Sequence, residues 1–109
     1  MVWVSHDNPI LAEIVRRLVE AYQPERIYLF GSVAREEASA NSDYDLLIVV
    51  PDDAPPERRT SRLGYQALRG NGVAVDVVVW DHSRFEKRAK VASSLSASVL
   101  REGRLLYAA

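Results

Sequence analysis

The apolar run "LLIVV" at residues 46–50 constrains the fold of this chain more than any other stretch of its sequence. Its composition, with Ile48, Val49 and Val50 all β-branched, is typical of a strand. Successive side chains of a strand point to opposite faces of its sheet, so an unbroken apolar run indicates burial on both faces. We therefore expect a strand at residues 43–50 whose apolar end is covered on both sides.

Helices and strands alternate along the rest of the chain. Asn8 as N-cap and a proline at the first helical position precede an apolar stripe of helical spacing, which ends before Pro24. One long final helix, ended by Gly103, is predicted by the stripe of Phe85, Ala89, Ala92, Leu95 and Val99. Other segments predict strands at 26–30, 73–80 and 104–107, a helix at 57–69, and a short helix or turn at 32–38. This order argues for an α/β (α+β) fold, with helices packed against a small mixed sheet of about four strands.

The length and composition of the chain limit the classes of protein to which it can belong. Its 109 residues, 48% of them apolar, suffice for one core, so we expect a single domain over residues 1–109. The net charge of −1 gives no overall basic field, which argues against nucleic acid as a direct ligand. The sequence has no cysteine, no recognisable signal peptide and no apolar run near the ~20 residues of a membrane span. These features predict a cytoplasmic protein without disulfides or thiolate metal sites.

Three aspartates stand on predicted strands. Asp43 and Asp45 share one face of their strand, with Cα atoms about 6–7 Å apart. Two carboxylates this close repel unless a cation lies between them, and Mg²⁺ is a hard cation that takes carboxylate oxygens. Asp76 is the one charged residue of the strand at 73–80, where an unpaired buried carboxylate would cost several kcal/mol. If the two strands are neighbours, three carboxylates converge, enough to hold two metal ions about 3.5–4 Å apart for phosphoryl-type transfer.

Gly31 and Ser32 follow the predicted strand at residues 26–30 and open the short helix or turn after it. A helix N-terminus presents free backbone N–H groups and a partial positive charge, which favour an anion. Glycine lets the backbone approach a phosphate closely, and the Ser32 hydroxyl adds a donor. Arg35, one turn later, either adds a charge-assisted contact or pairs with a carboxylate. We therefore predict that Gly31 and Ser32 bind phosphates that the metal also contacts.

The pattern G-S-x-A-R followed by S-D-x-D-L, with Gly31 twelve residues before Asp43, resembles the nucleotidyltransferase superfamily typified by DNA polymerase β. The nearest resemblance is to its minimal members from bacteria and archaea, and it extends over nearly the whole chain, including the later strand aspartate and the stretch REGRLLY. It implies the polymerase β-like nucleotidyltransferase fold. It also implies two sets of site residues: Asp43, Asp45 and Asp76 as catalytic residues and metal ligands, and Gly31, Ser32, Arg35 and Ser42 as nucleotide and phosphate ligands.

The resemblance further implies an activity and a partner. Such enzymes transfer a nucleoside monophosphate from a nucleoside triphosphate to a hydroxyl and release pyrophosphate, and we expect Mg²⁺ as cofactor and ATP as substrate. Many minimal members are encoded beside an all-helical HEPN protein, and such pairs form toxin–antitoxin systems in which the nucleotidyltransferase adenylylates the toxin. The resemblance thus implies a protein adenylyltransferase that acts as the antitoxin of a HEPN-type toxin.

Two alternatives to this activity stay open at the level of sequence. The chain could keep the fold but inhibit its partner stoichiometrically, or the acceptor could be a small molecule or RNA. Glu36 stands where the family pattern has a glycine, and a carboxylate near a triphosphate is electrostatically unfavourable unless it points to solvent. The sequence names neither the base, the acceptor nor the oligomeric state, and a homo-oligomer is one option.

Other residues receive structural interpretations. Arg58, Arg59, Arg62 and Arg69 predict a solvated helix face, with a surface for a partner or nucleotide as the alternative. His6 and His82 have no acidic or histidine neighbour at metal-ligand spacing and are expected at the surface. Trp80 is expected in the core or at an interface.

Overall fold

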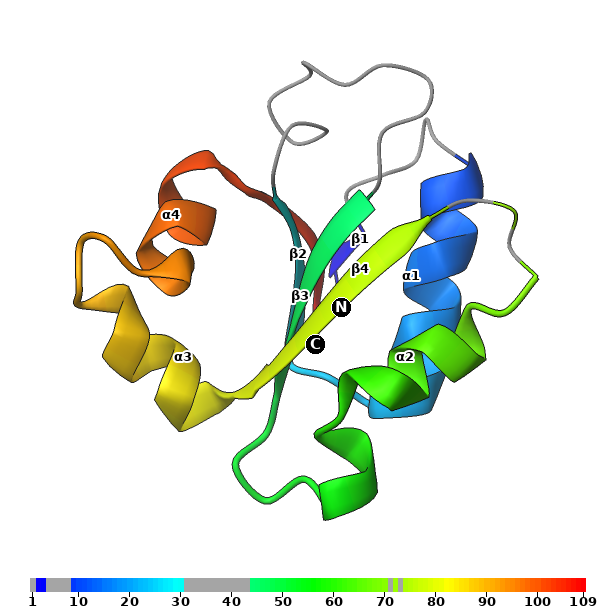
Figure 1. Ribbon diagram of the computed structural model, residues 1–109, viewed down its shortest axis with the longest axis horizontal. Helices are drawn as coiled ribbons and strands as arrows, with labels where there is room; N and C mark the ends of the chain where they lie inside the picture. The colour runs from blue at the N-terminus through cyan, green and yellow to red at the C-terminus, as the bar shows by residue number, and fades with distance from the viewer. Residues whose placement is uncertain (1, 4–8, 31–43, 71, 73) are drawn as a thin grey trace.

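The computed structural model describes residues 2–3, 9–30, 44–70, 72 and 74–109 of the chain. Its elements (Figure 1) follow one another as β1 (Val2–Trp3), α1 (Pro9–Tyr22), β2 (Arg26–Phe30), β3 (Tyr44–Val50), the 3-10 turn η1 (Pro56–Arg58), α2 (Ser61–Ala67), β4 (Val75–Asp81), α3 (His82–Ala89), α4 (Leu95–Glu102) and β5 (Arg104–Ala108). No helix within these ranges is long and apolar enough to cross a membrane. The short helix or turn that is predicted at 32–38 lies outside the described residues.

The five strands form one mixed sheet in the order β1-β5-β2-β3-β4. β3 and β4 pair in parallel, and the other neighbouring strands pair antiparallel. β3 therefore lies inside the sheet, whereas β4 forms one of its edges. The mixed sheet with packed helices confirms the predicted fold class, and the two-residue β1, which the sequence does not predict, adds a short strand at the other edge.

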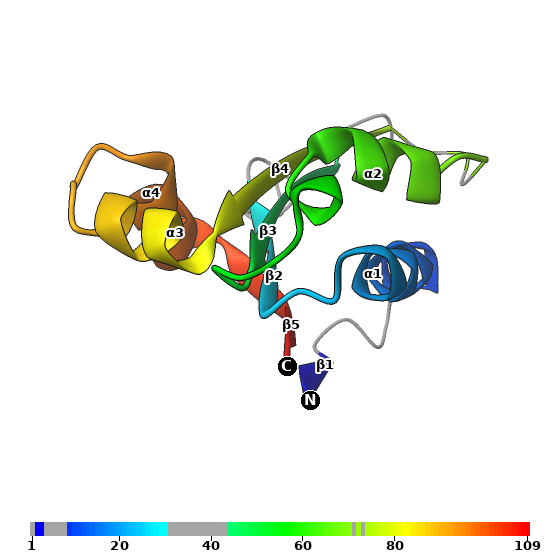
Figure 2. The ribbon, with the colours of Figure 1, turned by 90° about the horizontal axis from the view of Figure 1, so that it is seen from below.

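Helices cover both faces of the sheet, with α1 and α2 on one side and α3 and α4 on the other (Figure 2). The α1–α2 core includes Leu11, Ile14, Leu18, Ile27, Leu29, Leu46, Ile48, Val50 and Val77, and the α3–α4 core comprises Tyr28, Leu47, Val49, Phe85 and Val99. Residues 46–50 of β3 thus alternate between the two cores, and all five are fully buried. The predicted burial of this run on both faces is confirmed.

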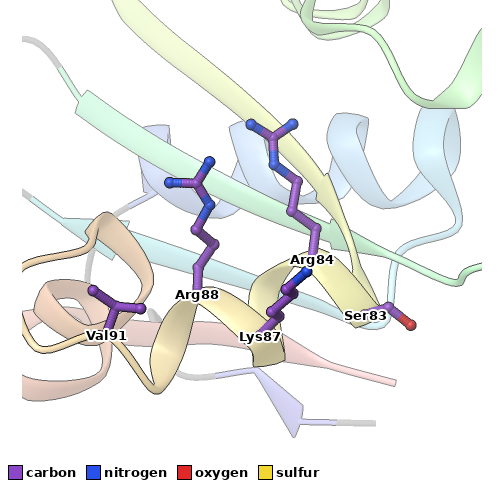
Figure 3. A pocket seen from close by; sticks show the side chains of 5 residues that line it. All are labelled: Ser83, Arg84, Lys87, Arg88 and Val91. Carbon is purple, nitrogen blue, oxygen red and sulfur yellow. The ribbon is translucent and has the colours of Figure 1, made fainter.

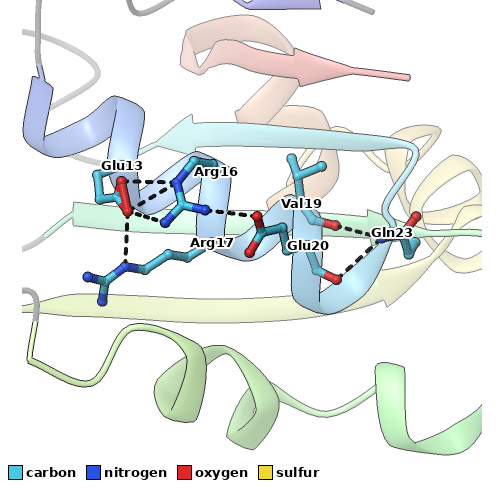
Figure 4. A network of polar contacts seen from close by, with 6 residues as sticks. All are labelled: Glu13, Arg16, Arg17, Val19, Glu20 and Gln23. Atoms are coloured by element: carbon cyan, nitrogen blue, oxygen red, sulfur yellow. Dashed lines mark hydrogen bonds and ion pairs between the residues drawn. The ribbon is translucent and has the colours of Figure 1, made fainter.

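The outward face of α1 is a closed network of ion pairs (Figure 4). The Arg16 guanidinium pairs with Glu13 and, at 2.8 Å, with Glu20, while Arg17 lies 3.4 Å from the same Glu13 carboxylate. The hydrogen bond from Arg16 lowers the pKa of Glu13 to about 2. Because these charges satisfy one another along the helix, the solvent face of α1 offers few free charges to a partner.

Tyr22 joins α1 to α2 through a buried hydroxyl. The hydroxyl donates to the Thr60 carbonyl oxygen at 2.6 Å and accepts from the Gly64 backbone N–H at 2.7 Å. A β-carbon at Gly64 would lie 2.9 Å from the Tyr22 oxygen, so this position needs glycine for close approach. Burial raises the pKa of Tyr22 to about 12, which keeps the hydroxyl neutral and able to donate.

The segment between β3 and β4 contains less helix than predicted. Residues 57–69 form part of η1 and then α2, instead of one helix that begins at Glu57. Thr60 separates the two with extended backbone, at φ −109° and ψ 146°. The predicted turn after α2 uses glycine as expected, since Gly70 and Gly72 have φ of 82° and 85°.

The prediction of one long final helix is wrong, because the helix is interrupted between α3, which ends at Ala89, and α4, which begins at Leu95. Each of the two helices has its own N-cap: an Asp81 carboxylate oxygen accepts from the Arg84 backbone N–H at 2.8 Å, and the Ser94 hydroxyl accepts from the Ala97 N–H at 3.1 Å. Ala92, which the continuous stripe would bury, is exposed in the connection.

Candidate active site

Asp45 and Asp76 lie side by side at the start of the two parallel strands. They are register partners between β3 and β4. Neighbouring strands are about 5 Å apart, so the backbone brings these two carboxylates together from residues 31 positions apart in the sequence. The sequence left open whether the two aspartate-bearing strands are neighbours, and the pairing of β3 with β4 shows that they are.

Both side chains belong to the sheet face that α3 and α4 cover further along. Asp45 lies two residues before Leu47 of β3, and Asp76 lies two residues before Val78 of β4, so each aspartate shares a sheet face with its neighbour. Leu47 and Val78 both pack in the α3–α4 core. At the start of the strands this face opens to solvent, since Asp45 is half-buried and Asp76 is exposed. The site is therefore a pair of neighbouring carboxylates, one half-buried and one exposed, next to the apolar residues Leu47 and Val78 of the same face.

The exposure of Asp76 corrects one expectation from the sequence. Its apolar neighbours predict a buried carboxylate, but β4 is an edge strand and Asp76 is exposed near its start. The exposed carboxylate therefore has no free-energy cost of burial to offset, and its position beside Asp45 is the feature that indicates a role.

The other predicted site residues, Gly31, Ser32, Arg35, Ser42 and Asp43, lie outside the described residues. The chain enters and leaves that range next to the aspartate pair: Phe30, the last residue of β2, is the register partner of Asp45 on its other side. The backbone N–H of Tyr44 also donates to the Ala74 carbonyl oxygen at 3.1 Å, which ties the starts of β3 and β4 together.

A hard divalent cation fits the two described carboxylates. They supply oxygen ligands from adjacent strands on one face, and a cation between them would offset their mutual repulsion. Within the described ranges no group of three or more histidine, cysteine or acidic side chains could hold a metal, so the described residues offer two carboxylates to such a cation.

Trp80, Arg84 and Arg88 form a second feature on the same sheet face, at the far end of β4. The guanidinium carbon of Arg84 lies 4.8 Å from the centroid of the Trp80 ring, and that of Arg88 lies 5.9 Å from it. Figure 3 shows these two arginines extending side by side from α3. Sequence reasoning missed this cluster, although two arginines four residues apart on a helix that follows a tryptophan are a readable signal.

The arginines that the sequence does single out are placed differently. Arg59 is not part of a free basic face: its Nε donates to the Ala54 carbonyl oxygen at 2.7 Å, and its Nη1 lies 3.0 Å from Asp81 Oδ2. Arg62 and Arg69 are exposed, which agrees with the interpretation as solvated side chains.

Polar contacts join the start of α3 to residues that flank β2 and β3. His82 Nδ1 lies 2.6 Å from Glu25 Oε1, and this partner raises the pKa of the imidazole. The Asp52 carboxylate accepts from the Ser83 hydroxyl and backbone N–H, which lowers the pKa of Asp52. These contacts join the start of α3, the helix that carries the arginine pair, to the residues before β2 and after β3.

A comparison with known protein families identifies the family of this chain. The model of the nucleotidyltransferase domain matches residues 10–106. The chain belongs to the nucleotidyltransferase family. It is therefore an enzyme of the nucleotidyltransferase class, and Asp45 and Asp76 are candidates for the acidic residues of its active site.

Individual relatives agree with this assignment. This nucleotidyltransferase is 33% identical over 104 residues to a protein of Methanocaldococcus jannaschii named "Putative protein adenylyltransferase", covering 94% of the chain and 99% of that protein. A solved structure described as a minimal nucleotidyltransferase is 29% identical with a TM-score of 0.56, over 92% of this chain and 97% of the other. A crystal structure of a toxin–antitoxin with AMP-PNP has the same fold, with 23% sequence identity and a TM-score of 0.65. The match covers 90% of this chain and 73% of the other.

Proposed function

We propose that this nucleotidyltransferase transfers AMP from ATP to a hydroxyl group of a partner protein, with Mg²⁺ as cofactor. The observation that carries the proposal is the pairing of Asp45 with Asp76 on one open face of a nucleotidyltransferase-family sheet. The adenylyltransferase name of a relative that spans 94% of the chain supports AMP as the transferred group.

In this proposal the three aspartates have different roles around the reacting phosphorus. Asp43 and Asp45 would hold the cation that carries the triphosphate, and Asp76 would complete a second site. Magnesium bound there would neutralise charge on the phosphates and acidify the acceptor hydroxyl. Asp76, as the accessible carboxylate of the pair, takes the proton as the acceptor oxygen forms its bond to the α-phosphorus. The bond from that phosphorus to the bridging oxygen breaks, and pyrophosphate leaves.

The segment that follows β2 in the sequence is proposed to hold the triphosphate. Phe30 lies beside Asp45, so Gly31 and Ser32 follow directly from a strand next to the carboxylates. Their backbone N–H groups and the Ser32 hydroxyl would bind phosphate oxygens. Arg35 and Ser42 are proposed as further phosphate ligands from the same segment.

The partner in this proposal is a HEPN-type toxin, and the nucleotidyltransferase is its antitoxin. The fold shared with a toxin–antitoxin that was crystallised with AMP-PNP supports an adenine nucleotide and a toxin as partner, whereas the HEPN type rests on the resemblance in sequence. We place this activity in the cytoplasm, where nucleoside triphosphates are available.

The test is an incubation of the chain and the protein encoded by its neighbouring gene with each of the four α-labelled nucleoside triphosphates and Mg²⁺. We expect label on the partner with ATP, lost without Mg²⁺ and lost in Asp76→Asn. Inhibition of the partner by Asp76→Asn at equal stoichiometry and without nucleotide would instead establish a binding inhibitor and refute the enzymatic mechanism.

A further inference from the structure

We propose that Arg84, Lys87 and Arg88 form a docking groove for an acidic segment of the polypeptide acceptor. This inference rests on the proposed function, because it concerns the acceptor of the same site. The three cations line one hollow along α3 together with Ser83 and Val91 (Figure 3).

Basic residues are more closely spaced along α3 and the residue after it than elsewhere in the chain. Residues 84–90 hold four basic side chains, including both lysines of the chain, whereas the whole chain has a net charge of −1. The one acid within them, Glu86, lies 3.0 Å from Arg26 on β2. The side chains of Arg84, Lys87 and Arg88 are exposed and form no ion pair with any residue that the structure describes. On α1, by contrast, the arginines pair with acids of their own helix.

Trp80 presents the two arginines to solvent in a fixed arrangement. Both guanidinium groups lie over its ring, so one aromatic side chain positions two cations from successive turns of α3. Neither guanidinium group donates a hydrogen bond to a residue that the structure describes, so their N–H edges are available. Those edges match the two oxygens of a carboxylate, so the groove is suited to acidic side chains.

The position of the groove favours the acceptor over the nucleotide. Trp80 follows Asp76 by four residues on the same face of β4, which is a distance of about 13 Å along the strand. An acceptor held by acidic residues in the groove can therefore present a hydroxyl several residues away to the aspartate pair. The triphosphate is proposed to bind at the opposite side of that pair, next to β2. A nucleic-acid strand would call for a longer basic track than one two-turn helix.

Binding of a labelled peptide with a central tyrosine and flanking glutamates tests this inference without catalysis. Its anisotropy is followed at low salt, and the fluorescence of Trp80 is followed in a Trp3→Phe background. We expect the peptide to bind and to change the emission of Trp80. The double variant Arg84→Glu/Arg88→Glu should weaken binding about tenfold or more, and high salt should do the same in the wild type.

A matched control changes the same charge on the other face of the sheet. Arg62→Glu/Arg69→Glu should bind the glutamate peptide to within about twofold of the wild type, apart from the small effect of net charge. Equal weakening in both double variants, no binding to the wild type, or equal binding of a peptide with glutamines in place of glutamates would each overturn the docking groove.

Two further arms separate this proposal from other occupants and from the proposed function. Tighter binding of a single-stranded oligonucleotide, or loss of ATP binding in Arg84→Glu/Arg88→Glu, would overturn it in favour of nucleic acid or the triphosphate. Asp76→Asn should still bind the peptide. If the peptide binds at α3 but no nucleotide is transferred to any acceptor, the groove stands and the proposed function fails. If transfer to the partner is unaffected by the α3 variant, the groove fails alone.

Discussion

Replacement of Asp76 by asparagine should stabilise the metal-free protein. The substitution keeps the shape of the side chain and removes one of two like charges on neighbouring strands, whose backbones are about 5 Å apart. Coulomb's law gives a repulsion of about 0.8 kcal/mol in water and about 3 kcal/mol at an effective dielectric constant of 20. Because Asp76 is exposed and Asp45 is half-buried, the lower part of this range applies, and we expect about 1 kcal/mol. In a domain of this size, that corresponds to a rise in Tm of about 4–8 °C.

Thermal unfolding followed by circular dichroism measures this effect at low salt, first in EDTA and then in millimolar Mg²⁺. In EDTA the Tm of Asp76→Asn should exceed that of the wild type. In Mg²⁺ the order should reverse or the gap should close, because a cation that binds only the folded wild type stabilises it by mass action. Asp53→Asn, an exposed substitution in the loop after β3, removes the same charge elsewhere and should show neither effect.

Two results would refute the reasoning. A lower Tm of Asp76→Asn in EDTA would mean that the carboxylate makes favourable contacts in the metal-free fold. An equal rise in Tm with Mg²⁺ for wild type and variant would mean that Asp76 does not contribute to a cation site.

Two more substitutions test the fold around the site. Tyr22→Phe should lower the free energy of unfolding by about 1–3 kcal/mol in urea titrations, because the Thr60 carbonyl and the Gly64 N–H lose their shared partner; a loss within experimental error would contradict that role. The His82–Glu25 pair raises the folded-state pKa of His82 above 6.5, so its stabilisation is complete below that pH and is lost as pH rises through the folded-state pKa. His82→Gln should therefore cost more stability near pH 5.5 than near pH 8.5, and a cost that is independent of pH would contradict the ion pair.

The sequence predicts the sheet and the first helix well because their signals are local. The apolar stripe of α1 and the apolar run of β3 each reflect burial by one element against the core, so periodicity is enough to find them. The break between α3 and α4 is not found in this way. There the stripe continues across residues 90–94, and only the capping serine Ser94 marks the new helix start.

The candidate site is predictable only in part, because some of its features are local in the sequence and others depend on how the strands are ordered. The motif around Asp45 and the isolated Asp76 are visible in the sequence, but their adjacency depends on the parallel pairing of β3 with β4. The exposure of Asp76 depends on β4 being the last strand of the sheet, which is a property of strand order and not of neighbouring residues. The contact of Arg84 and Arg88 with the Trp80 ring likewise depends on the angle between α3 and β4, which no local pattern encodes.

The most direct measurement of the central claim compares ATP labelled at the α-phosphate with ATP labelled at the γ-phosphate, in the presence of the neighbouring gene's product and Mg²⁺. Transfer of a nucleoside monophosphate puts the α-label on the partner, leaves the γ-label in released pyrophosphate, and produces one pyrophosphate for each AMP attached. We predict this result for the wild type and no label for Asp45→Asn. Transfer of the γ-label, or equal α-labelling by wild type and Asp45→Asn, would contradict the account.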